Sequence, residues 1–132
     1  MADMMQFDLV SPERMLASFE ASEIEIPGAE GDFTAMPDHA ALVTTMRPGI
    51  LKVKGAAETK EYVVTGGFVE ISAGSTSVLA ETAIPRGEID RATVDGLIEA
   101  AETAAGEVAD GARDIADKRV ADTKALIDTL GL

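Results

Sequence analysis

The chain has 132 residues, a formal net charge of −13, a hydrophobic content of 46% and no cysteine. This composition is sufficient for a packed core, and it excludes disulfides, thiolate metal sites and cysteine nucleophiles. Binding to nucleic acid or to an anionic membrane surface needs clustered Lys and Arg, and the sequence has no such cluster. No apolar run is long enough to span a bilayer, and residues 1–5 lack the features of a signal peptide, so we expect a cytoplasmic protein.

Residues 1–86 predict an antiparallel β-sandwich. Glycine and proline turn signals recur about every ten residues, which is typical of sandwiches and barrels. Residues 23–26 and 51–54 alternate apolar and charged side chains, so each sheet should have one solvent face. The pair Gly66-Gly67 lacks the lysine and the helix of a phosphate loop, and we interpret it as a hairpin turn between strands over 62–64 and 68–69.

Residues 87–132 predict a two-helix antiparallel hairpin. Alanines become frequent, and two apolar stripes recur at helical spacing. The first stripe contains Val94, Leu97, Ile98, Ala101 and Ala105, and the second contains Ala112, Ala116, Val120, Thr123, Ile127 and Leu130. Glycines within 106–111 should end the first helix in a turn. Because the stripes are largely alanine and threonine, we expect the hairpin to pack weakly.

Catalytic and metal-binding patterns are weak in this sequence. His39 is the only histidine, so a catalytic zinc site would need an unusual set of carboxylates, and His39 is better interpreted as a structural or interface residue. No G-x-S-x-G motif is present. Glu30 and Asp32 flank Gly31 in a loop that is either a charged turn or a contact loop. The expectation is a non-catalytic, partner-binding protein without a metal or cofactor.

Seven ordered blocks in residues 10–86 resemble the epsilon subunits of F-type ATP synthases. They are 10–14 (VSPER), 24–28 (IEIPG), 30–33 (EGDF), 37–42 (PDHAAL), 47–49 (RPG), 66–71 (GGFVEI) and 78–83 (VLAETA). The resemblance implies a β-sandwich of about ten strands followed by a two-helix hairpin. It also implies a rotor subunit that couples proton movement to ATP synthesis without bond chemistry, as a peripheral protein on the cytoplasmic face of the inner membrane.

The implied partners are the gamma subunit and the polar loops of the c-ring. By position, Glu30, Gly31 and Asp32 match the family's ring-facing loop, and His39 matches a histidine near the gamma and ring contacts. Thr34 and Asp38 replace glycines that are usual in the family. A rotor contact should also bury aliphatic anchors, for which Leu42, Val43 and Met46 are candidates, with core burial as the alternative.

The hairpin departs from the family at its start. Many bacterial members carry Ile/Leu-Asp-x-x-Arg-Ala, a motif associated with ATP binding, where this chain has Ile89, Asp90, Arg91 and Ala92. An arginine displaced by two positions is rotated about 200° round a helix, so ATP binding should be weak or absent. The family's hairpin can also extend to the alpha and beta catalytic subunits and inhibit hydrolysis. The bases of the second helix are diluted by aspartates, so any inhibition should be weak.

Two other functions stay open at this point. One is a free-standing sandwich that binds an unrelated protein or small ligand, and the other is a hydrolase that uses paired carboxylates. Co-purification with gamma and the catalytic subunits separates the rotor subunit from the sandwich module. Activity of the isolated chain would be needed for the hydrolase.

Overall fold

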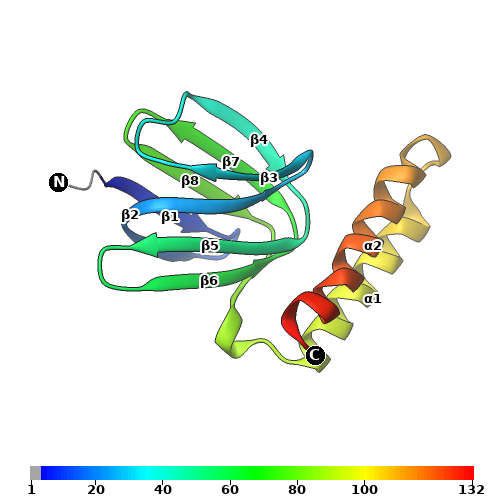
Figure 1. The fold of residues 1–132 in the computed structure, drawn as a ribbon. Helices are drawn as coiled ribbons and strands as arrows, with labels where there is room; N and C mark the ends of the chain where they lie inside the picture. The colour runs from blue at the N-terminus through cyan, green and yellow to red at the C-terminus, as the bar shows by residue number, and fades with distance from the viewer. Residues whose placement is uncertain (1–3) are drawn as a thin grey trace. The chain divides into compact units, whose positions relative to one another are not determined.

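The computed structural model describes residues 4–132, which form nine strands and two α-helices (Figure 1). The chain divides between Arg86 and Gly87 into two compact units. The strands are β1 (Met5–Val10), β2 (Met15–Gly28), β3 (Gly31–Ala35), β4 (Leu42–Met46), β5 (Gly49–Gly55), β6 (Thr59–Val64), β7 (Gly67–Ser72), β8 (Ser75–Ala80) and β9 (Ala83–Pro85). The second unit contains α1 (Arg91–Glu107) and α2 (Arg113–Leu130), with short 3-10 helices at Arg86–Glu88 and Asp110–Ala112. The predicted sandwich and helical hairpin are confirmed, with nine strands described rather than about ten.

The long strand β2 joins the two layers of the sandwich. Its first half pairs with β1 and its second half pairs with β3 and β5, so the sheet folds over on itself. One layer continues from β1 through β8 and β7 to β4, and the other continues from β5 to β6 and β9. The β1–β8 pair is parallel and the other pairs are antiparallel. A single residue pair, Gly28 with Met46, links β2 to β4.

The core lies between the two layers and follows the period-two alternation of the sequence. Ile24, Ile26, Leu51 and Val53 are buried, while the charged residues between them face outward. Phe7 and Tyr62 are the aromatic members of this buried cluster, in which aliphatic residues are far more numerous, and Phe7 packs edge-on against Phe19 at 5.4 Å between ring centroids. The sandwich is therefore stabilised mainly by aliphatic burial, at about 25 cal/mol per Å² of apolar surface.

The prediction for Gly66-Gly67 was wrong. Strands β6 and β7 are not paired with each other, because β6 lies between β5 and β9 while β7 lies between β4 and β8. The two glycines instead carry the chain from one layer to the other. Sequence-local turn chemistry could not reveal this, since a glycine pair serves a hairpin and a crossing between layers equally well.

The hairpin buries a narrow apolar face. Val94, Ile98 and Ala105 are buried in α1, as predicted from the first stripe. In α2 the buried residues are Thr123 and Leu126, so the predicted stripe missed Leu126, and Ala112 is exposed. Neither helix combines the length and the apolar character needed to cross a bilayer, within the residues that the structure describes.

The glycines near the hairpin turn do not cap α1. Gly106 lies inside α1, which ends at Glu107 with the extended residue Val108 at its C-cap. The left-handed glycine cap occurs at the end of α2, where Gly131 has φ 71° and its N–H donates to backbone carbonyls of the last turn. The prediction of a turn within 106–111 holds, but its assignment to a glycine cap was wrong.

Candidate partner-binding surface

A row of apolar side chains crosses the outer face of β1, β8, β7 and β4. The strand registers place Val10 opposite Leu79 and Leu79 opposite Phe68, and Val43 lies one row away opposite Glu70. Phe68 is 57% exposed, Leu79 50% and Val43 68%. Met15 pairs with Val10 and is 59% exposed. We call Val10, Met15, Val43, Phe68 and Leu79 the apolar stripe.

The outer face of the other layer is polar. Oppositely charged side chains face each other across its strands and form ion pairs. These pairs are Lys52 Nζ to Glu25 Oε2 at 3.7 Å, Lys54 Nζ to Glu23 Oε1 at 2.7 Å and Arg86 Nη1 to Glu61 Oε2 at 2.8 Å. The Glu23 carboxylate raises the pKa of Lys54 through this hydrogen bond. The two outer faces therefore differ in chemistry. The face that carries the apolar stripe is the one that water solvates poorly.

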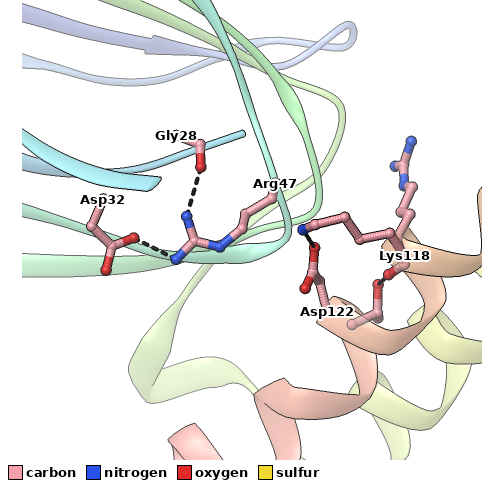
Figure 2. Close-up of polar contacts among 7 residues, drawn as sticks. Gly28, Asp32, Arg47, Lys118 and Asp122 are labelled. Atoms are coloured by element: carbon pink, nitrogen blue, oxygen red, sulfur yellow. Dashed lines mark hydrogen bonds and ion pairs between the residues drawn. The ribbon is translucent and has the colours of Figure 1, made fainter. Parts of the chain in front are cut away.

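The predicted contact loop is a tight turn with an acidic tip. Gly28 and Gly31 form the last pair of the β2–β3 ladder, and Ala29 and Glu30 form the exposed turn between them. Asp32 accepts a charge-assisted hydrogen bond from Arg47 Nη2, so its carboxylate is already bonded to another residue of the sandwich unit (Figure 2). Glu30 is exposed at the tip and is therefore the acid of this loop that is best placed to meet a partner.

His39 lies in the turn between β3 and β4, close to the ring of Phe33. The two ring centroids are 6.2 Å apart, and His39 Nδ1 lies 2.6 Å from the carbonyl oxygen of Ala40. The backbone N–H of His39 donates to Met36 O, which closes the turn. Among the described residues no non-glycine residue has a positive φ, so Thr34 and Asp38 fit without strain where the family usually has glycine.

The three aliphatic candidates have different environments. Val43 belongs to the apolar stripe. Leu42 is opposite buried Ile71, so it lies on the core side of β4 and is 38% exposed at the strand's end. Met46 is only 6% exposed and belongs to the core. The environment of Met46 is therefore that of the alternative, core burial.

Three exposed residues of the stripe were missed by the sequence analysis, namely Met15, Phe68 and Leu79. A signal for two of them is present. Phe68 and Leu79 occupy the phase of their strands opposite to buried Val69 and Val78. A large apolar residue in the outward phase of a strand can be recognised locally. Its neighbours on the adjacent strands cannot be recognised in this way, because they depend on which strands pair.

The first residues of the hairpin have structural roles. Asp90 is the N-cap of α1, and its Oδ1 accepts hydrogen bonds from Thr93 N at 2.8 Å and Thr93 Oγ1 at 2.7 Å. The bonds from the side chain and then the backbone of Thr93 lower the pKa of Asp90. Arg91 pairs with Asp95 one turn later at 3.0 Å. Weak or absent ATP binding by Ile89, Asp90, Arg91 and Ala92 stays a prediction.

Comparison with known proteins places this geometry in a family. Residues 4–86 match the model of the ATP synthase delta/epsilon chain β-sandwich domain. The chain is 52% identical over 126 residues to the ATP synthase epsilon chain of Jannaschia sp., with 96% of both chains covered. It is 51% identical to the ATP synthase epsilon chain of Rhodobacter capsulatus, again covering 96% of each.

The fold also matches a solved structure. A chain of the Euglena gracilis mitochondrial ATP synthase, solved as OSCP/F1/c-ring, superposes with a TM-score of 0.73 at 22% identity and covers 96% of this chain and 81% of that chain. The curated relatives align through the hairpin as well as the sandwich. The alternative of an unrelated free-standing sandwich module therefore has no support. This chain belongs to the family of ATP synthase epsilon chains.

Proposed function

We propose that this chain is a non-catalytic rotor subunit in the central stalk of a proton-translocating ATP synthase. Family membership and the apolar stripe support this function. The subunit would transmit torque between the c-ring and the gamma subunit at the cytoplasmic face of the membrane, without making or breaking bonds. The net charge of −13 disfavours direct contact with anionic lipid, so association with the membrane would depend on the other subunits.

The apolar stripe would bind the gamma subunit. Its four most exposed members are each at least half exposed, and they lie together on one face. This is the observation that carries the proposal, because exposed bulky apolar side chains gathered on one face gain free energy when a partner covers them. A persistent rotor contact needs a buried area on the order of 800 Å² per partner, so residues around the stripe would also take part.

The acidic turn at Ala29-Glu30 would contact the polar loops of the c-ring. Glu30 is exposed and sits at the end of the sandwich where β2 and β3 turn. A carboxylate at the tip suits a partner that presents basic or polar groups. His39, in the next turn along the chain, belongs to the same proposed contact region.

The stripe can be tested with a charge placed in its middle. We expect Phe68→Glu to weaken binding of the full-length chain to ATP synthase complexes stripped of this subunit by roughly 30-fold or more, because a carboxylate would have to be desolvated there. Binding can be measured by titrating labelled chain onto the stripped complex. Because Phe68 is exposed, the unfolding midpoint should change little.

Ser72→Glu provides the matched control. Ser72 is exposed on the same strand and the same face, two side chains along from Phe68 and beyond the stripe. The Ser72→Glu variant carries the same added charge as Phe68→Glu and should bind like the unchanged chain. Equal affinity for Phe68→Glu and Ser72→Glu would contradict a gamma contact through the stripe.

A further inference from the structure

The Ala29-Glu30 turn is built to a tight geometry. Gly31 has φ 142°, which side-chain-bearing residues rarely adopt. A Cβ on Gly28 would lie 2.6 Å from the carbonyl oxygen of Gly31 and 2.9 Å from the Phe33 ring. The two strands therefore approach each other closely on either side of the turn. Such a turn has few alternative conformations once its flanks are fixed.

Arg47 fixes both flanks from a separate part of the chain. Its Nη1 donates to the carbonyl oxygen of Gly28 at 2.6 Å, at the end of β2. Its Nη2 donates to Asp32 Oδ1, at the start of β3 (Figure 2). The planar guanidinium thus bridges the two strands that the turn connects, a geometry that a single ammonium group would not reproduce.

Backbone contacts complete the attachment. Arg47 N donates to Pro27 O at 2.9 Å, and Ala29 N donates to Thr45 O at 3.0 Å. The turn is therefore held at four points by residues from the end of β4 and just beyond it. The Arg47 side chain is 28% exposed and the Asp32 side chain 76%, so the guanidinium is held against the sandwich while the carboxylate stays open to solvent.

We call the bonds from the Arg47 side chain to Asp32 and to the Gly28 carbonyl the Arg47 clamp. This clamp leaves the two acids of the loop in different states. Asp32 is paired with Arg47, whereas within residues 4–132 the structure gives Glu30 no hydrogen bond or ion pair. Without Arg47 the turn would carry two unpaired carboxylates two residues apart, and their repulsion would favour other conformations. With Arg47 present, a single unpaired carboxylate is presented at a defined position.

We propose that Arg47, acting through Asp32 and the Gly28 carbonyl, is a positioning residue that holds Glu30 ready for its partner. The inference rests on the proposed function, in which this turn meets the polar loops of the c-ring. A pre-ordered turn loses less conformational entropy on binding than a loose one, so the clamp raises the affinity of the Glu30 contact. Arg47 itself does not touch the partner in this proposal.

The test is a double-mutant cycle on the full-length chain between Glu30→Gln and Arg47→Met. Each variant is titrated onto two stripped assemblies, the catalytic head with gamma alone and the same head with the c-ring attached. The ring-dependent gain in affinity is the quantity of interest. We expect each single change to reduce that gain by on the order of tenfold, and the double change to reduce it hardly further, because both act on one contact.

The ion pair between Lys54 and Glu23 on the polar sheet provides a control. Lys54→Met removes an ion pair of the sandwich away from the turn and should leave the ring-dependent gain unchanged. If Arg47→Met lowers the folded fraction, Asp32→Ala removes the carboxylate end of the clamp at a site whose side chain is 76% exposed. It should reduce the ring-dependent gain in the same direction but by less, because the bond from Arg47 Nη1 to the Gly28 carbonyl remains.

The outcomes separate the clamp from the function on which it depends. If the unchanged chain gains no affinity from the ring, the proposed ring contact fails and the clamp fails with it. If Glu30→Gln loses the gain while Arg47→Met and Asp32→Ala keep it, the ring contact stands and the clamp alone is wrong. Additive losses in the double variant would also overturn the clamp, since Arg47 would then act independently of Glu30.

Discussion

At residue scale, Gly67 is the position where the sandwich tolerates a side chain least. A Cβ there would lie 2.0 Å from the carbonyl oxygen of Leu79 and 2.9 Å from the Cα of Ala80, and φ is 130°. Both atoms belong to β8, so no flexible side chain can move aside. We expect Gly67→Ala to lower the free energy of unfolding by about 3 kcal/mol or more, as measured by urea denaturation.

Gly74→Ala provides a comparison in which a positive φ occurs without a close approach. Gly74 also has a positive φ, of 76°, but a Cβ there meets nothing within 4 Å. Its substitution should cost only about 1–2 kcal/mol, the strain of a left-handed alanine. Equal losses for the two variants would mean that the close approach of β7 to β8 does not add to the loss of unfolding free energy caused by Gly67→Ala.

At the scale of single elements, α1 depends on its Asp90 cap. The folded-state pKa of Asp90 lies below its ordinary value of 3.8 because Thr93 hydrogen-bonds to the carboxylate. A depressed pKa contributes stability that is present above the unfolded value and is lost as pH falls through the folded value. Helix stability in this unit should therefore decrease in acid, below about pH 4.

Asp90→Asn isolates this contribution. Asparagine caps helices as well as aspartate but does not titrate, so the variant should lose less helical circular dichroism than the unchanged chain between about pH 5 and 2. Glu99→Gln removes one acidic charge from the exposed side of the same helix and serves as the matched control. If the Asp90→Asn curve follows that of the unchanged chain, the cap does not contribute to the acid response.

The sequence was sufficient to predict which side chains of a strand face the core, but not which strands pair. Alternation in residues 23–26 and 51–54 predicted which side chains enter the core, because the pleat fixes that outcome within a strand. The path of the chain at Gly66-Gly67 was not predictable in this way, since it depends on which distant strands pair. Likewise, Phe68 and Leu79 become neighbours only through the β7–β8 register, so the apolar stripe is a property of tertiary pairing.

For the whole molecule, the family resemblance predicted more than local patterns could. Turn spacing, alternation and helical stripes were sufficient for the order of sandwich and hairpin, but none of them indicates a rotor subunit or a contact loop at Glu30, which only the resemblance implied. It did not indicate that Met46 belongs to the core or that Asp32 is bound to Arg47. Those two facts depend on the side chains that surround each residue, and these can differ between sequences that share a backbone fold.

The hairpin's part in the complex can be examined by removing residues 87–132. Two bases of α2 are already paired within the helix. Arg113 pairs with Asp117 at 3.3 Å. Figure 2 shows the second pair, Lys118 with Asp122 at 2.6 Å. Binding to acidic catalytic subunits would have to break these pairs, and each exposed pair of this spacing contributes about 0.2–0.5 kcal/mol. Breaking them would cost little, but the aspartates of α2 would face the same acidic partner as its bases, so the net gain from an inhibitory contact should be small.

We expect ATP hydrolysis by the reconstituted complex to change by no more than about twofold when the hairpin is deleted, the rate equivalent of a few tenths of a kcal/mol. The deleted chain keeps the apolar stripe and the Arg47 clamp, so its affinity for the stripped complex serves as the control and should be unchanged. A several-fold rise in hydrolysis at full occupancy would show that the hairpin inhibits the enzyme through contacts other than the charged residues of α2. In that case its exposed apolar residue Ile115, which is 77% exposed, would be the first position to substitute.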